Sequence, residues 1–200
     1  MTVLFLATGN QGKLREFREL LVTTGLTLEP VDTGVAETGN SYGANAALKA
    51  EAAALARSGP ALGDDSGLEV AALGGYPGLH SARIAATQAE REALLFERLR
   101  TQPRPWPARF VCLLALAVPG RQTLTFKGEA AGEIREPAGR GQGFGYDPVF
   151  WPAGSRLSFA ELPPMQKHRL SHRGAAVRAL LGSGALASLG GVSEQREGRR

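Results

Sequence analysis

The amino-acid sequence predicts an α/β fold in which a mixed β-sheet carries helices on its faces. Apolar runs of strand length alternate with helical-period segments in the first half of the chain. Residues 110–118 and 123–134 form two longer strand-like runs joined through Pro119-Gly120, which predicts a β-hairpin. The 200 residues are 43% hydrophobic and include 26 glycines and 12 prolines, which indicates a sizeable core with many tight turns. We expect one domain over residues 1–192, with a second lobe formed by the middle of the chain.

The first half of the chain predicts alternating strands and helices. Strands are expected over residues 3–6, 26–31 and 61–63, with a further strand over 68–73. The first helix follows the turn Thr8-Gly9-Asn10, has apolar residues at helical spacing over 14–21, and stops at Gly25. Ser41 is the predicted N-cap of a helix over 44–57, which Gly59-Pro60 ends.

The second half contains further boundary signals. Thr87 with Glu90 predicts a capping box for a helix that extends to about residue 100. The proline-rich residues 103–107 are expected to be a rigid connector before the hairpin, and residues 137–148 are glycine-rich. Ser171 is the predicted N-cap of a last helix over 175–189, and the charged residues 193–200 are expected to be a disordered basic tail.

Composition narrows the cellular setting and the partners. Cys112 is the single cysteine and lies in an apolar run, so we expect an inert core residue and no internal disulfide. The start lacks the features of a signal peptide, and the longest apolar run is too short to span a membrane, which predicts a soluble cytoplasmic protein. The net charge of +4 fits either an anionic small substrate or an ordinary basic surface. With neither a basic stripe nor interleaved aromatics, no nucleic acid or membrane partner is predicted.

The segment Thr8-Gly9-Asn10-Gln11-Gly12-Lys13 lies between a predicted strand and a predicted helix. The unpaired N–H groups at a helix start favour an anion, and Lys13 is placed to reach a phosphate. A capped turn with a surface lysine is the alternative. The chain contains no G-x-x-x-x-G-K-[ST] motif, so this is not a Walker A loop.

Two further segments carry polar side chains near predicted element ends. Asn45 and Lys49 are four residues apart and share one helix face, either at the edge of a polar site or with the lysine in solvent. Asp64-Asp65-Ser66-Gly67 follows a short apolar strand, and adjacent aspartates suit a hard cation such as Mg²⁺. Aspartate and serine are also common turn residues, so a plain turn stays open.

The last two segments lie towards the end of the chain. Phe144 and Tyr146 stand among the glycines of residues 139–148, where a ring can stack on a base, although a flexible loop is the alternative. Those same two aromatics occupy the positions where a G-x-G-x-x-G dinucleotide motif needs its last glycine. Lys167 and Ser171-His172-Arg173 offer donors for keto oxygens or phosphates, or form a capped helix with a solvated basic end. His80 and His168 receive no role.

Taken together, these segments resemble the inosine/xanthosine triphosphate pyrophosphatase family, in particular its bacterial dITP/XTP-type enzymes. The resemblance extends from residue 3 to about residue 181. Its carriers are Ala7-Thr8-Gly9-Asn10-x-Gly12-Lys13, Asn45-Ala46-x-x-Lys49-Ala50, Asp64-Asp65-Ser66-Gly67-Leu68, Leu73-Gly74-Gly75-x-Pro77-Gly78, Ser81-Ala82-Arg83, Gly143-Phe144-Gly145-Tyr146-Asp147-Pro148-x-Phe150 and Ser171-His172-Arg173. Each motif is weak alone, but all seven in this order are highly specific.

The resemblance implies a homodimeric, Mg²⁺-dependent enzyme that hydrolyses ITP, dITP and XTP to the monophosphate and pyrophosphate. It implies a two-lobed fold around a long mixed sheet, with the active site in the cleft between the lobes. The implied triphosphate-binding residues are Thr8, Gly9, Asn10, Gly12 and Lys13. Glu37 and Asp65 are implied to bind Mg²⁺, and Asp65 to be the general base, with Lys49 nearby.

The remaining implied roles concern the substrate's nucleoside half. Ser66 is implied to contact the substrate. The residues implied to stack on the base or contact it are Phe144, Gly145, Tyr146 and Asp147. Those implied to read its keto edge are Lys167, His172 and Arg173.

Two positions depart from the family pattern. Ala44 stands where the family often has glutamate, and Ala71 where it often has aspartate. If either carboxylate supports the metal or the water, this chain lacks that support. A pyrophosphatase for other modified nucleotides and a non-catalytic nucleotide-binding module therefore stay open as alternatives.

Overall fold

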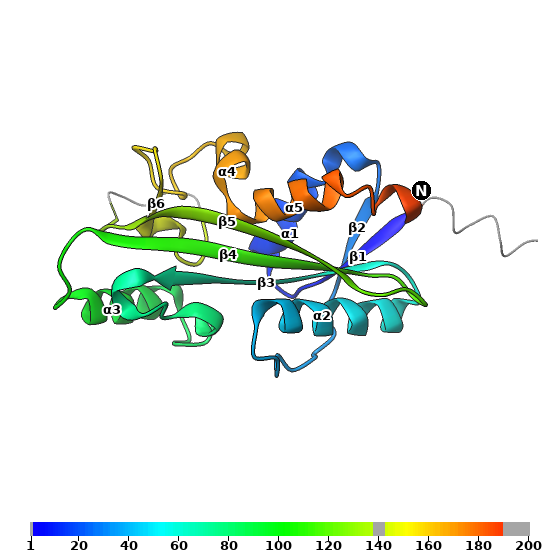
Figure 1. Cartoon of the computed structure of the whole chain (residues 1–200), viewed down its shortest axis with the longest axis horizontal. Helices are drawn as coiled ribbons and strands as arrows, with labels where there is room; N and C mark the ends of the chain where they lie inside the picture. The colour runs from blue at the N-terminus through cyan, green and yellow to red at the C-terminus, as the bar shows by residue number, and fades with distance from the viewer. Residues whose placement is uncertain (1, 138–142, 190–200) are drawn as a thin grey trace, which may run out of the picture.

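The computed structural model describes residues 2–137 and 143–189 and confirms the α/β fold (Figure 1). In this part of the chain a six-stranded mixed sheet has the strand order β2-β1-β3-β4-β5-β6. Its strands are β1 (Val3–Ala7), β2 (Thr27–Val31), β3 (Ala61–Val70), β4 (Trp106–Ala117), β5 (Leu124–Ile134) and β6 (Phe150–Pro152). β1 pairs in parallel with β2 and with β3, and the other neighbours are antiparallel. The predicted hairpin is the β4–β5 pair.

Helices cover both faces of the sheet. They are α1 (Gln11–Leu20), α2 (Tyr42–Arg57), α3 (Gln88–Leu99), α4 (Pro164–Leu170) and α5 (His172–Gly182). The short 3₁₀ helices are η1 (Val22–Thr24), η2 (Ala71–Leu73), η3 (Gly78–His80), η4 (Asp147–Val149) and η5 (Ala187–Leu189). Figure 1 shows α2 and α3 on one side of the long strands and α4 and α5 on the other. None of the described helices is long and apolar enough to cross a membrane.

The predicted N-caps of α2, α3 and α5 are confirmed, and a further cap opens α1. The Asn10 side chain accepts a hydrogen bond from the backbone N–H of Lys13 at 3.1 Å, which opens α1. Ser41 caps α2 in the same way, Thr87 and Glu90 form the reciprocal capping box of α3, and Ser171 caps α5. These local hydrogen bonds need only neighbouring residues, and for that reason the sequence reveals them.

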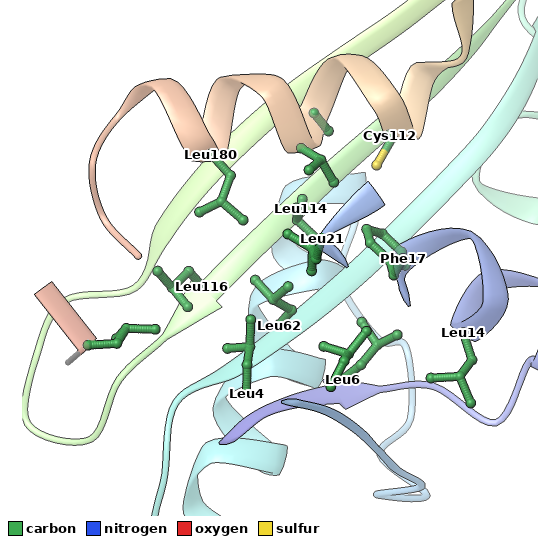
Figure 2. Close-up of a cluster of buried hydrophobic side chains, with 14 residues drawn as sticks. Leu4, Leu6, Leu14, Phe17, Leu21, Leu62, Cys112, Leu114, Leu116 and Leu180 are labelled. Carbon is green, nitrogen blue, oxygen red and sulfur yellow. The ribbon is translucent and has the colours of Figure 1, made fainter. Parts of the chain in front are cut away.

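The main core lies between the sheet and the helices α1 and α5. Inward-facing leucines of four strands meet the apolar faces of both helices, and the cluster includes the buried thiol of Cys112, as predicted (Figure 2). The residues labelled there are Leu4, Leu6, Leu14, Phe17, Leu21, Leu62, Cys112, Leu114, Leu116 and Leu180. This core holds α1 and α5 against the same face of the sheet.

Strand β3 is longer than the sequence predicts. Its ten residues run through Asp64-Asp65-Ser66-Gly67, so ending the strand at Gly63 was wrong. Each residue from Ala61 to Val70 pairs with β4, whose long-range pairing overrides the local turn preference of Asp and Ser. The predicted strand over 68–73 is therefore the end of β3, followed by η2.

Several other boundaries differ from the prediction. β4 begins at Trp106, inside the expected connector, because Trp106, Ala108 and Phe110 alternate with exposed residues and bury one face. α5 covers His172–Gly182 instead of 175–189, since it starts directly after its cap. β6 and α4 are too short for periodicity to reveal, although the Pro163-Pro164 pair marks the start of α4. The tail 193–200 and residues 138–142 lie outside the described residues.

Close contact between α2 and β3 depends on Gly63. A Cβ added at this glycine would lie 2.2 Å from the carbonyl oxygen of Ala46 and 2.6 Å from the backbone nitrogen of Ala50. Both atoms belong to the helix backbone, so α2 could not stay in place. The missing side chain thus lets α2 approach the strand that carries Asp65.

We expect Gly63→Ala to lower the free energy of unfolding by about 1–3 kcal/mol or more, because the methyl group overpacks the α2–β3 contact. Gly182→Ala is the matched control, since nothing lies within 4 Å of its added Cβ. Urea unfolding followed by circular dichroism measures both. Equal midpoints for the two variants would contradict the close-contact argument.

Candidate active site

Two pockets meet in the middle of the sheet. The first, here the lysine pocket, is lined by Ala7, Thr8, Gly9, Asn10, Lys13, Val31, Asp32, Thr33, Gly34, Val35, Glu37, Lys49 and Asp64. The second, here the aromatic pocket, is lined by Ser66, Gly67, Ser81, Ala82, Arg91, Phe110, Phe144, Gly145, Tyr146, Asp147, His172 and Arg173. Asp64 joins the two, because Ser66 Oγ donates to its Oδ1 at 2.5 Å and Arg173 Nε lies 3.7 Å from its Oδ2.

The first sequence segment forms one end of the lysine pocket. Thr8, Gly9, Asn10 and Lys13 all line it, and Lys13 Nζ lies 2.5 Å from Asp64 Oδ2. Gly12 is not among the lining residues. A Cβ added there would lie 2.7 Å from the ring of Phe144, so this glycine makes room for that ring.

Lys49, which lines the lysine pocket together with Glu37, also contacts Asp65, which is not among the residues lining either pocket. Its Nζ lies 2.7 Å from Glu37 Oε1 and 3.2 Å from Asp65 Oδ1. Asn45, fully buried one helical turn earlier, donates to Asp65 Oδ2 at 3.1 Å and accepts from the N–H of Gly39 at 2.8 Å. The shared helix face predicted for Asn45 and Lys49 is confirmed, and it is directed at Asp65.

The two adjacent aspartates differ in basicity. Burial alone would raise the pKa of Asp64, but the charges of Lys13 and Arg173 outweigh it and hold that pKa far below its usual range. Burial is the largest influence on Asp65 and raises its pKa. The charge of Lys49 and the hydrogen bond from Asn45 lower that pKa, and the charges of Glu37 and Asp64 raise it, so that the net shift is upward. Asp64 is therefore a fixed anion, whereas Asp65 is the stronger base.

The aromatic pocket contains an unpartnered histidine. The His172 ring is buried and stacks on Phe110, with ring centroids 4.6 Å apart and an interplanar angle of 10°. Neither of its ring nitrogens has a hydrogen-bond partner among the described residues. Burial and the charge of Arg173 hold the pKa of His172 well below its usual value, so the ring is neutral and offers one donor and one acceptor.

A buried ionic network lies behind the aromatic pocket. Lys167 Nζ contacts Glu16 Oε1 at 2.5 Å and Asp147 Oδ2 at 2.7 Å, and Arg173 Nη1 donates to Glu16 Oε2 at 3.0 Å. Lys167 does not line the pocket itself, but its Nζ is 5.3 Å from the centre of the Phe144 ring.

Tyr146 is mostly buried beside this network. Its hydroxyl donates to the carbonyl oxygen of Ser81 at 3.1 Å, which ties the η4 segment to the turn after η3. Tyr146 thus lines the pocket, while its hydroxyl forms a hydrogen bond within the protein.

Sequence reasoning missed two acidic residues of this region. Glu16 is buried on the face of α1 that also carries Lys13 and Phe17, three and one residues away, and that spacing was the available signal. Asp32 lines the lysine pocket and directly follows β2, at the carboxyl end of a parallel strand, where binding residues of such sheets gather.

The carboxylates of this site suit a cation held by few protein ligands better than a metal ion surrounded entirely by protein side chains. Among the described residues no group of three or more metal-ligating side chains converges. Glu37 and Asp65 both contact Lys49, and Glu37 also pairs with Arg83, whose Nη1 lies 3.2 Å from its Oε2. Mg²⁺ is commonly held by one or two carboxylates together with phosphate oxygens and water, and this donor set fits that pattern.

We expect His172 to make stability depend on pH. Its pKa is lower in the folded than in the unfolded state, so its contribution is complete above the unfolded value of about 6.5 and is lost as pH falls. His172→Phe should flatten this fall by up to about 1.4 kcal/mol per pH unit in denaturant titrations. The exposed His80→Gln variant should keep the wild-type slope. A steeper slope in His172→Phe would contradict a neutral buried ring.

Comparison with known proteins shows which family has this architecture. The model of the Ham1 family matches residues 4–183. A protein of Gloeobacter violaceus named dITP/XTP pyrophosphatase is 48% identical over 184 residues, covering 90% of this chain and 93% of that protein. One of the same name from Deinococcus radiodurans is 47% identical over 181 residues, covering 88% and 89%.

Solved structures agree with the sequence relatives. A HAM1 protein from Coxiella burnetii superposes with a TM-score of 0.80 at 38% identity, covering 94% of this chain and 100% of that chain. A nucleoside-triphosphatase / dITP/XTP pyrophosphatase from Mycobacterium abscessus has a TM-score of 0.69 at 37% identity, covering 91% and 99%. The match in sequence, in fold and over nearly the whole length shows that this chain belongs to the Ham1 family.

Proposed function

We propose that this protein hydrolyses the non-standard purine triphosphates ITP, dITP and XTP to the nucleoside monophosphate and pyrophosphate. The observation that carries the proposal is the junction of the two pockets at Asp64. A pocket of lysines and carboxylates suited to phosphates there adjoins an aromatic pocket with an unpartnered histidine. Membership of the Ham1 family and relatives named dITP/XTP pyrophosphatase support the same function.

In this proposal the lysine pocket binds the triphosphate. Thr8, Asn10 and Lys13 contact phosphate oxygens beside the N-terminus of α1, with the backbone of Gly9 close by. Glu37 and Asp65 would hold Mg²⁺. When bound, the cation neutralises charge on the phosphate oxygens and makes the phosphorus more electrophilic.

Asp65 is the proposed general base. Its raised pKa suits it to take a proton from the water whose oxygen attacks the α-phosphorus. The new bond joins the water oxygen to that phosphorus, the bond to the bridging oxygen breaks, and pyrophosphate leaves. Asn45 and Lys49 orient the Asp65 carboxylate, and the positive charge of Lys49 stabilises the phosphate charge that develops.

The aromatic pocket is the proposed site for the base. Phe144 offers a ring face beside Gly145, with Tyr146 and Asp147 on the same wall, and Ser66 contacts the nucleoside from β3. His172 and Arg173, with Lys167 behind them, favour the keto oxygen of hypoxanthine and xanthine. Adenine has an amino group at this position, so donor would face donor.

The two positions that depart from the family pattern, Ala44 and Ala71, differ in their distance from the proposed site. Ala71 lines a separate groove with Glu69 and Arg109, away from both pockets. Ala44 lies in the first turn of α2, where its methyl group is close to Gly39 and thus near the segment that carries Glu37. Only the substitution at Ala44 therefore stands beside the proposed metal ligands.

We further propose that the enzyme is a cytoplasmic homodimer with the active site in a cleft between two lobes. The family resemblance is the support for each of these points. Light scattering coupled to size exclusion tests the oligomeric state.

Pyrophosphate release from a panel of triphosphates, with and without Mg²⁺, tests the function. We expect ITP, dITP and XTP to be cleaved and ATP to be poor, EDTA to abolish turnover, and Mg²⁺ to restore it. Release only from modified pyrimidine triphosphates would favour a pyrophosphatase of other specificity. No release at all would favour a non-catalytic nucleotide-binding module, and full activity in EDTA would remove the metal from the proposal.

The aspartate pair provides a test of roles. Asp65→Asn should lower kcat at least about 10²-fold while leaving the protein folded, because it removes the base and a metal ligand. Asp64→Asn should instead lower stability, by about 3–5 kcal/mol, since it leaves the buried Arg173 and the partly buried Lys13 without their shared anion. Steady-state kinetics and thermal melts separate the two. A mild Asp65→Asn beside an inactive but stable Asp64→Asn would reverse the assignment.

A further inference from the structure

Arg91 is a cation of the aromatic pocket that neither the sequence motifs nor the proposed roles include. It comes from α3 and is half-exposed at the pocket wall. Its guanidinium donates to three backbone carbonyls of the segment before α3: Ala82 at 3.0 Å, Thr87 at 3.1 Å and Ala86 at 3.5 Å. These bonds fix the position of the charge without neutralising it. Among the described residues no carboxylate forms an ion pair with it.

The other charges around the pocket are matched by opposite charges. The cations Lys13, Lys167 and Arg173 pair with the three anions Glu16, Asp64 and Asp147. Because every member is paired, the network contributes little net charge to the pocket.

Few titratable groups face Arg91 directly. Glu90, the preceding residue of α3, is exposed and its carboxylate accepts from the N–H of Thr87. Burial raises the pKa of the Tyr146 hydroxyl, the charge of Arg91 lowers it, and Tyr76 and Glu92 raise it further. Glu92, the next residue of α3, accepts from the side-chain amide of Gln88 and forms no ion pair with Arg91 among the described residues. The neutral ring of His172 completes the pocket from α5. Arg91 therefore leaves the pocket with an excess of positive charge.

We propose that Arg91 makes the aromatic pocket select an anionic purine base, so that XTP is preferred over ITP and dITP. The proposal rests on the proposed function. Xanthine has two keto groups and loses a ring proton near neutral pH, whereas hypoxanthine stays neutral until well into the alkaline range. A fixed guanidinium at the pocket wall favours the anion, and at a partly screened site its charge is worth about a tenfold difference in kcat/KM.

Three variants test the proposal at a pH above the xanthine pKa. Arg91→Gln removes the charge, Arg91→Lys keeps it while losing the fork of carbonyl contacts, and Arg100→Gln removes an equal charge from the exposed end of α3. We expect the ratio of kcat/KM for XTP to that for ITP to fall about tenfold in Arg91→Gln only. Arg91→Lys should keep most of the ratio, and Arg100→Gln should keep both rates.

The pH dependence gives an independent readout. Below the xanthine pKa both bases are neutral, so the wild-type preference for XTP should shrink, and the ratios of wild type and Arg91→Gln should converge. Equal losses on XTP and ITP in Arg91→Gln would overturn the proposal, because Arg91 would then only support residues 82–87. A wild-type ratio that does not change with pH would overturn it as well.

Binding measurements separate this proposal from the proposed function. Calorimetry with XMP and IMP on Asp65→Asn needs no turnover and should show a preference for XMP that Arg91→Gln removes. If wild type releases no pyrophosphate but this preference persists, the hydrolytic function fails and the selectivity stands. If pyrophosphate is released but XMP and IMP bind equally at both pH values, the selectivity fails alone.

Discussion

The site depends on the alternation of side chains along β3. Successive residues of a strand point to opposite faces of its sheet, so Asp64 and Asp65 cannot share one environment. Asp64 faces α1 and α5, and it contacts Lys13 and Arg173 there. Asp65 faces α2 and contacts Asn45 and Lys49. Pairing with β1 on one side and β4 on the other holds this register. Two neighbouring carboxylates thereby acquire pKa shifts in opposite directions.

Buried charge on the α1 and α5 face is tolerated because it is balanced. Three cations, Lys13, Lys167 and Arg173, meet three anions, which are Glu16, Asp64 and Asp147. Taking each ion out of water is costly, and only close pairing offsets the cost. The partners come from α1, β3, η4, α4 and α5, so the network also orients these segments relative to one another. Such a network adds little net stability but strongly penalises any arrangement that separates a pair.

The sequence predicted those features of the fold that depend on interactions between neighbouring residues. The caps at Ser41, Thr87 and Ser171 and the β4–β5 hairpin follow from neighbouring residues, and so they were found. The uninterrupted β3 was not, because its polar middle is held by pairing with β4, some fifty residues away in the chain. Glu16 and Arg91 were not predicted as site residues for a similar reason. An acidic or basic residue on a helix usually faces solvent, and only the tertiary fold brings these two to the pockets. The residue roles taken from the family resemblance remain predictions, although the fold gathers nearly all of them around two adjoining pockets.

In the proposed function the two pockets bind parts of one molecule, and the shared anion at Asp64 links them. Lys13 belongs to the pocket suited to phosphates and Arg173 to the pocket suited to a base, yet both contact the same carboxylate. A phosphate that draws Lys13 towards itself weakens the hold of Lys13 on Asp64, and the anion then interacts more strongly with Arg173. Because Arg173 is also anchored by Glu16, it stays in place at the base pocket while the balance of charge changes. In the proposed function the fold therefore sets the position of the guanidinium before the substrate enters, which is the pre-organisation that selective binding requires.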